Sequence, residues 1–126
     1  MSLEIKATLK TPEVKINAED GTILLAGISI PEDRYAFYAP VNEAIEDYLK
    51  SPQPITKLEF RLEYFNTSST LVIRNIIRSL AESASDTKLE VTWVYEEYDE
   101  DMREAGEEFK LLFSKVNFEL QRVEEF

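Results

Sequence analysis

In one segment of the chain, residues 55–65, charged and apolar side chains alternate without interruption from Lys57 to Tyr64. This two-residue period is that of a β-strand with one face buried and the other in solvent. The expected buried face consists of Leu58, Phe60, Leu62 and Tyr64, and the expected solvent face of Lys57, Glu59, Arg61 and Glu63. The segment therefore predicts a sheet at the centre of the fold.

The residues before this strand predict a hairpin and a helix. Residues 13–30 form two apolar runs around the turn Ala18–Gly21, where glycine can adopt a positive φ. A helix is expected next, with Pro40 near its first turn, where a missing N–H has no cost. Its buried face would hold Val41, Ala44, Ile45, Tyr48 and Leu49. The first ten residues are expected to be loosely attached.

The residues after the strand predict two more helix–strand pairs. A helix is expected from about Ser68 to Ala84, with inward residues Ile73, Ile76, Ile77, Leu80 and Ala84. A strand over 88–96 precedes a helix over 99–114, with inward residues Met102, Ala105, Phe109, Leu112 and Phe113. Gly106 within that helix indicates close approach to the sheet, and residues 117–124 form a last strand.

The predicted order is β-β-α-β-α-β-α-β. Strands that alternate with helices require crossovers, which predict a mostly parallel or mixed sheet with helices packed on it and the hairpin at one side. With 126 residues, the chain is expected to be a single α/β domain over 1–126.

Charge and composition exclude several classes of function. The chain has 25 acidic and 14 basic residues and a net charge of −11, which disfavours nucleic acid and anionic membrane surfaces as partners and favours a basic partner. It has no cysteine and no histidine, so disulfides, thiolate zinc sites and His-based triads are excluded. The longest apolar stretch, Ile23–Ile30, is too short to span a bilayer, and no apolar segment opens the chain, so a cytoplasmic location is expected.

The acidic run of residues 96–109 has two further interpretations, a metal site and a carboxylate enzyme. Its spacing does not match the calcium-loop pattern, and its acids lie on predicted solvent faces. Asp99 is instead expected to cap the helix, with Glu100 and Asp101 in its first turn. We therefore expect no metal, no cofactor and no enzymatic activity.

The junction after the alternating strand reads "NTSST", residues 66–70. Asn66 or Thr67 is expected to be the helix N-cap, because a short side-chain oxygen there accepts a free backbone N–H. On a helical wheel, one outward stripe lies apart from the core residues and contains Thr67, Leu71, Arg74, Arg78 and Ser85. Because apolar anchors and arginines are typical of interface centres, this stripe is consistent with a docking surface. The alternative is that Leu71 packs under a neighbouring loop and that the arginines form a solvated face.

The same junction could hold a regulatory phosphate. Free N–H groups and the helix dipole favour an anion at a helix N-terminus, so phosphorylation of Thr67, or alternatively Ser68 or Ser69, should leave the helix folded. Arg74 lies about 10 Å further along the axis and is too distant to clamp that phosphate.

Three segments, together with their spacing, resemble one known family: "IPEDRYAFYAPVNEAIEDYL", "LEYFNTSST" and "VTWVYEEYDEDMREAGEEF". The chain resembles the SiaC-type bacterial regulatory phosphoproteins, which have a STAS (anti-sigma-factor-antagonist-like) architecture. The resemblance implies partner switching, in which a dedicated kinase phosphorylates the loop threonine, here Thr67, and a PP2C-like phosphatase removes the phosphate. The unphosphorylated form would bind and activate a diguanylate cyclase, in cyclic di-GMP and biofilm signalling.

The residues expected to bind partners are Asn66, Thr67, Ser68, Thr70, Leu71, Arg74 and Arg78. The alternative function is a STAS-like module that binds a small ligand or nucleotide near the start of this helix, although no Gly-rich phosphate loop is present.

Overall fold

The computed structural model describes residues 2–83 and 85–126. These residues form a six-stranded mixed sheet whose spatial order, β1-β2-β3-β4-β5-β6, follows the chain. The first two strand pairs are antiparallel and the last three are parallel. The strands are Leu3–Ile5 (β1), Glu13–Asn17 (β2), Thr22–Ser29 (β3), Ile55–Phe65 (β4), Lys88–Glu96 (β5) and Asn117–Val123 (β6).

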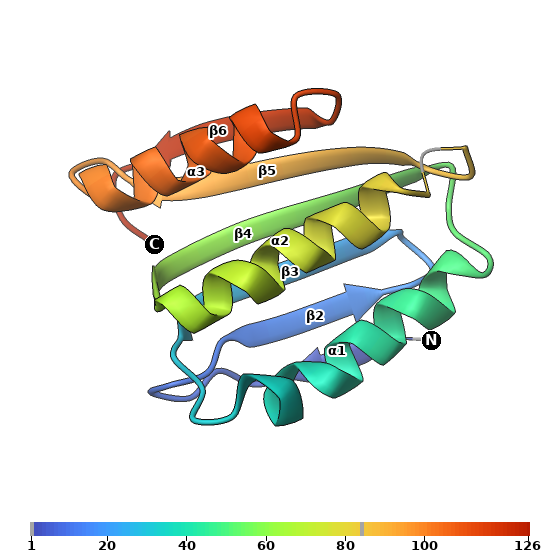
Figure 1. Ribbon diagram of the computed structural model, residues 1–126, viewed down its shortest axis with the longest axis horizontal. Helices are drawn as coiled ribbons and strands as arrows, with labels where there is room; N and C mark the ends of the chain where they lie inside the picture. The colour runs from blue at the N-terminus through green and yellow to red at the C-terminus, as the bar shows by residue number, and fades with distance from the viewer. Residues whose placement is uncertain (1, 84) are drawn as a thin grey trace.

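Three helices connect the parallel strands: Arg34–Leu49 (α1), Thr67–Ala81 (α2) and Glu100–Leu112 (α3). Each crossover moves one strand further along the sheet, and because such crossovers are right-handed, the helices lie on the same face. Figure 1 shows α1, α2 and α3 side by side in front of the sheet. The opposite face carries the charged side chains of β4, including exposed Lys57 and Glu63. The predicted α/β fold, with a hairpin beside a parallel sheet, is confirmed.

The core lies between the sheet and the helices. Phe60 and Trp93 from the central strands are fully buried, and their rings lie 5.1 Å apart. The predicted inward face of α2 is confirmed for Ile73, Ile76, Ile77 and Leu80, which are all buried, whereas Ala84 lies outside the described residues. This core fixes the helices against the sheet.

The N-terminal segment is more ordered than the sequence predicts. Residues 3–5 pair with β2 as an antiparallel edge strand, and Leu3 and Ile5 pack against the core. The expectation of ten loosely attached residues is therefore wrong for β1, because its alternating apolar residues give it a buried side.

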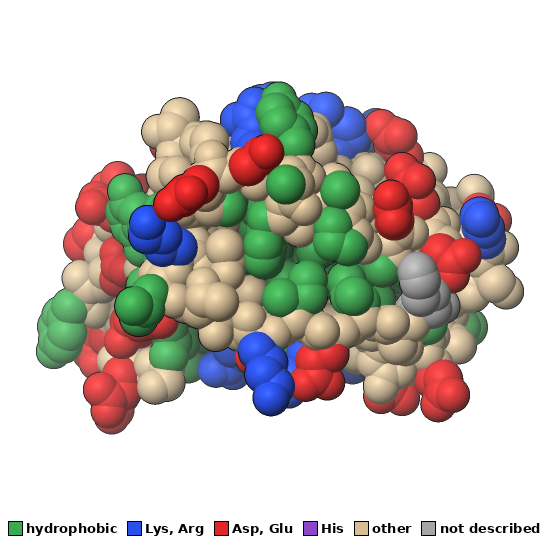
Figure 2. Space-filling model, turned by 90° about the horizontal axis from the view of Figure 1, so that it is seen from below, with side chains coloured by type: hydrophobic (Ala, Val, Ile, Leu, Met, Phe, Trp, Pro, Cys, Tyr) green, Lys and Arg blue, Asp and Glu red, His purple; other side chains and the backbone are tan. Residues whose placement is uncertain are grey.

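Figure 2 shows the molecule from below, relative to the view of Figure 1. Hydrophobic side chains gather in the middle of that face.

The first helix begins earlier than predicted. Asp33 is its N-cap, and its carboxylate accepts hydrogen bonds from the backbone N–H groups of Tyr35 and Ala36. Pro40 therefore lies inside α1 instead of in its first turn. The extra turn is retained because it buries Tyr38, which is 1% exposed.

The alternating strand changes register near its end. Gly27 pairs with Leu62, but Ile28 pairs with Tyr64, so β4 contains one extra residue at Glu63. This bulge turns Tyr64 into solvent, where it is 56% exposed, and Phe65 packs against the core in its place. The prediction that Tyr64 is buried is wrong, because strict alternation does not reveal a bulge.

The third helix confirms one prediction and corrects another. A Cβ added to Gly106 would lie 2.4 Å from Trp93 Cδ1, so the predicted close approach to the sheet is confirmed. Met102 and Phe109 are buried as expected, and Ala105 and Phe113 are partly buried against the core. Leu112 was expected to point inward but is 57% exposed, because it is the last residue of α3 and borders an open hollow beside α2.

Candidate functional site

The loop between β4 and α2 is organised by Asn66. Its side-chain oxygen accepts hydrogen bonds from the Ser69 backbone N–H at 3.1 Å and from the Ser68 hydroxyl at 2.9 Å. Asn66 is thus the N-cap, and Thr67 is the first helical residue. The sequence predicted either Asn66 or Thr67 as the N-cap. The structure shows that Asn66 is the cap, because its side-chain oxygen accepts from the third residue of the helix.

Ser69 has a structural role in the interior. Its side chain is fully buried, and its hydroxyl donates to the Ser29 carbonyl oxygen at 2.9 Å and shares a hydrogen bond with the Ser29 hydroxyl at 2.8 Å. The Ser29 hydroxyl in turn contacts the Tyr38 hydroxyl at 2.6 Å. Burial raises the pKa of Tyr38 above its ordinary value, and the hydrogen bond between the Tyr38 and Ser29 hydroxyls partly opposes this shift. A kinase could not reach Ser69 in this conformation.

Thr67 is the exposed hydroxyl residue of the first turn of α2, whereas Ser68 is half-buried and bonded to Asn66. A group added at Thr67 would therefore project into solvent without disturbing the cap. Free N–H groups and the helix dipole at this end of α2 favour added negative charge. Of the three hydroxyls considered from the sequence, Thr67 is the one that the geometry leaves most accessible.

Sequence reasoning missed a cation beside this loop. Arg34, the first residue of α1, donates from Nη1 to the Ser68 carbonyl oxygen at 3.2 Å and from Nη2 to the Tyr35 hydroxyl at 2.8 Å. Its guanidinium also lies over the Tyr35 ring, 4.8 Å from the centroid. A separation of 34 residues hid this contact, and only the position of α1 beside α2 brings Arg34 next to Ser68 at the start of α2.

The predicted docking stripe borders a groove on the α3 side of α2. Thr70 and Arg74 line the groove near the start of α2, and Arg78 lines it near the end. Leu71 is half-buried, so it is less exposed than the wheel predicts. Ser85 lies beyond the end of the helix at Ala81 and does not belong to the stripe.

The acidic residues at the start of α3 have local partners. Asp99 is the N-cap and accepts from the Met102 backbone N–H at 3.0 Å, as predicted. Glu100 and Glu107 both pair with Arg103 on the surface of the same helix. These contacts account for several of the acids by helix capping and ion pairing.

The fold and this site define a two-layer α/β protein with an accessible threonine at the start of its middle helix. None of the helices in the described residues is long and apolar enough to cross a membrane. The family model for SiaC family regulatory phosphoproteins matches residues 5–123. The chain therefore belongs to the SiaC family.

Individual proteins agree with this assignment. An uncharacterised protein of Pseudomonas aeruginosa strain UCBPP-PA14 is 30% identical over 109 residues, which cover 86% of each chain. The crystal structure of apo-SiaC from Pseudomonas aeruginosa has a TM-score of 0.81 at 27% identity, covering 97% of this chain and 98% of that one.

A second similar structure contains a complex. It is the crystal structure of the diguanylate cyclase SiaD with its activator SiaC from Pseudomonas aeruginosa. The matching chain has a TM-score of 0.82 and 28% identity, and the match covers 95% of this chain and 97% of that one.

Proposed function

We propose that this protein is a regulator without enzymatic activity that binds a diguanylate cyclase and activates it, and that phosphorylation of Thr67 releases the cyclase. Membership of a family of regulatory phosphoproteins supports the regulatory role, and the relative solved with its cyclase supports the partner. The observation that carries the switch is the exposure of Thr67 beside two structurally engaged serines.

The proposed switch acts on the partner and leaves the fold intact. A phosphate adds about −1.5 to −2 charge at a helix end that already favours anions. On the surface that faces the partner, this charge would lie at one end of the stripe of Leu71, Arg74 and Arg78, where it would repel acidic groups of the partner. A kinase and a PP2C-like phosphatase would set the level of modification, and the output would be cyclic di-GMP and biofilm formation by a cytoplasmic pathway.

The test compares Thr67→Asp with unmodified protein and with Ser51→Asp, which adds the same charge at an exposed loop residue at the other end of the sheet. We expect Thr67→Asp to keep its circular dichroism spectrum and to lose binding and activation of the diguanylate cyclase from the same organism. Ser51→Asp should behave like the unmodified protein. Full activation by Thr67→Asp, or failure of the unmodified protein to bind any cyclase of that organism, would contradict the proposal.

A further inference from the structure

The two edges of the sheet differ in how open they are to another strand. β1 is three residues long, whereas β6 at the opposite edge extends over seven residues. β6 pairs with β5, and among the described residues no strand pairs with its other side, which forms the upper border of the sheet in Figure 1. Edge strands in soluble proteins are commonly short or carry proline or lysine, which prevents pairing with another chain. β6 has none of these features, so its edge is open to a further strand.

The backbone of β6 offers hydrogen-bonding groups along this open edge. The Glu97 N–H donates to the Val123 carbonyl oxygen at 2.7 Å, so the Val123 carbonyl faces β5. Because alternate residues of a parallel strand bond to the same neighbour, the N–H and C=O groups of Phe118, Leu120 and Arg122 point away from β5. These residues therefore supply a row of donors and acceptors to an added strand.

The sequence of β6 is complementary to itself when a second copy runs antiparallel. With Leu120 opposite Leu120 of the other copy, Phe118 lies opposite Arg122 and Glu119 lies opposite Gln121. The two leucines, which each pack partly against their own core, would contact each other, and the Gln121 amide can donate to the Glu119 carboxylate. No like charges are opposed in this register, and all the outward N–H and C=O groups of β6 find partners.

Other registers fit less well. A shift by one residue would oppose helix-covered side chains of one copy to open-face side chains of the other, so only shifts that keep the faces matched are available. A register centred on Glu119 opposes two carboxylates, and one centred on Gln121 leaves the outward groups of Phe118 without partners in β6. Pairing of β1 with itself over its three residues would oppose Glu4 to Glu4. Self-pairing is therefore favoured at the β6 edge and in the register centred on Leu120.

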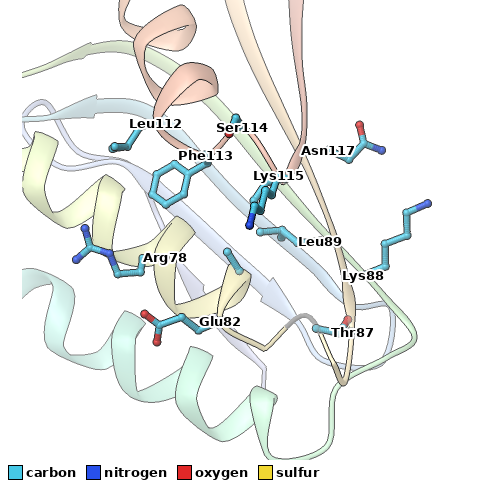
Figure 3. A pocket seen from close by; sticks show the side chains of 12 residues that line it. Arg78, Glu82, Thr87, Lys88, Leu89, Leu112, Phe113, Ser114, Lys115 and Asn117 are labelled. Atoms are coloured by element: carbon cyan, nitrogen blue, oxygen red, sulfur yellow. The ribbon is translucent and has the colours of Figure 1, made fainter.

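This register also determines how the helices of the two copies are arranged. An antiparallel pair has its twofold axis perpendicular to the sheet, so the helices of both copies lie on one face. Leu120 pairs with Trp93, and Gly106 packs closely on Trp93, so α3 crosses the level of the axis near Gly106. The two α3 helices would then lie on either side of the junction. The groove between α2 and α3, which Figure 3 shows, lies away from the junction and stays uncovered.

The charges that α3 brings to the junction are balanced. A hollow of about 430 Å³ borders α3, and Glu107 and Lys110 line it. Arg103 pairs with both Glu107 and Glu100, so these four residues together carry no net charge. Glu104 is the remaining acid in this part of α3.

The charges of β6 and its flanks are nearly balanced as well. Glu119 and Arg122 offset each other within the strand, and the same register continued beyond the strand places Glu125 opposite Lys115. Glu124 is left over. Each copy nevertheless has a net charge of −11, so the whole molecules repel each other, and salt that screens this repulsion should favour association.

We propose that two copies of this protein associate by antiparallel pairing of their β6 strands, centred on Leu120, and that their two six-stranded sheets become one continuous sheet. This inference does not depend on the proposed function. Both α2 helices, each with Thr67 at its start, would lie on the same face of the dimer, so a partner with twofold symmetry could contact both.

The first experiment measures the association of the full chain by sedimentation velocity over a series of concentrations. We expect a reversible equilibrium between monomer and dimer that strengthens as salt is raised. Arg122→Pro removes an outward N–H and leaves the bonds to β5 in place, and we expect it to weaken the dimer about tenfold or more. Arg122→Ala keeps this N–H and is the matched control. A chain that is monomeric under all conditions, larger assemblies, or equal dimer affinities of the two variants would overturn the inference.

The second experiment tests the register with substitutions at exposed residues. Gln121→Glu places a carboxylate opposite Glu119 of the other copy, and we expect the dimer to weaken about fivefold. Adding Glu119→Lys to the same chain should restore association, because opposite charges then face each other. Asn42→Asp, which makes the same change from amide to carboxylate on the surface of α1, should have no effect. Absence of the loss or of the rescue would contradict the proposed pairing.

The third experiment follows hydrogen exchange of the unmodified protein by NMR as the concentration is raised. We expect exchange to slow at the outward amides of Phe118, Leu120 and Arg122. The amides of Glu119 and Gln121 face β5 and should change little. The test needs no variant to fold, and exchange that slows equally at all five amides, or at none of them, would count against pairing through β6.

Discussion

Two buried hydroxyl clusters lie at opposite ends of α1, and they differ in what they hold in place. At one end, Tyr38 contacts Ser29, which contacts Ser69 in the first turn of α2. At the other end, Tyr48 contacts Thr56 at 2.7 Å, and Thr56 contacts Thr87 at 2.7 Å.

The second cluster joins loops and strand starts. Thr87 donates to the Gln53 carbonyl oxygen at 2.6 Å, and the Gln53 N–H donates to the Tyr48 hydroxyl at 3.2 Å. The first cluster instead ends at Ser69 in the first turn of α2. Thr67, in the same turn, is exposed. Similar chemistry therefore joins loops at one end of α1, and at the other end it fixes Ser69, two residues from the exposed Thr67.

The largest expected effect separates Ser69 from Thr67. Ser69→Asp would place a carboxylate inside the first cluster, where burial without a cationic partner costs about 3–5 kcal/mol. Thr67→Asp adds an exposed acid to a helix first turn, which changes the free energy of unfolding by less than about 1 kcal/mol. Unfolding in urea measures the free energy of unfolding of both variants. Similar losses in the two variants would show that burial in the first cluster does not distinguish Ser69 from Thr67.

Removing one phenol oxygen from each cluster compares them directly. Tyr48→Phe leaves both Thr56 and the Gln53 N–H short of a partner, and we expect a loss of about 1–3 kcal/mol. Tyr38→Phe should cost less, about 1 kcal/mol, because Ser29 and Ser69 keep their bonds to each other. Hydrogen exchange should report the Tyr38→Phe loss at the start of α2, and uniform exchange across the sheet in both variants would contradict the comparison.

Alkaline pH offers a test of the first cluster by itself. The pKa of Tyr38 is raised above its ordinary value of 10.0 by burial, so the unfolded chain loses this proton first as the pH rises. The contribution of this pKa shift to the free energy of unfolding is therefore fully present below pH 10.0. Above that pH it is lost, by about 1.4 kcal/mol per pH unit, until Tyr38 of the folded protein ionises. Chemical unfolding between pH 9 and 11 should show a steeper loss for the unmodified protein than for Tyr38→Phe, and parallel curves would argue against it.

The smallest expected effect concerns Arg34. In the unmodified protein its bond to the Ser68 carbonyl is partly exposed, so Arg34→Gln should change stability by less than about 0.5 kcal/mol. With phosphate on Thr67, the guanidinium has an anion within reach, and the variant should lose about 0.5–1 kcal/mol more. Phosphorus NMR should also show a higher second pKa of the phosphate in Arg34→Gln, and Arg78→Gln is the matched control. An unchanged pKa would show that Arg34 does not contact the phosphate.

Most of the fold could be predicted from the sequence because it rests on local periodicity. The alternation in 55–65 and the period of α2 set the strand and its following helix, and Asp20–Gly21 set the turn, where Gly21 has a φ of +70°. The errors fall where a non-local contact outweighs the pattern. The bulge at Glu63 depends on pairing with β3, and the early start of α1 depends on the buried contact of Tyr38.

For the candidate site, the sequence by itself determined which residues stand at the junction of β4 and α2, because an N-capping residue followed by hydroxyls fixes the start of a helix. It also determined the acidic charge and the absence of histidine and cysteine. Only the tertiary structure decided that Ser69 is buried, that Arg34 lies beside the loop, and that Leu112 lines an open groove. These properties depend on how α1 and α3 pack beside α2, and helix packing brings together residues that no local period connects.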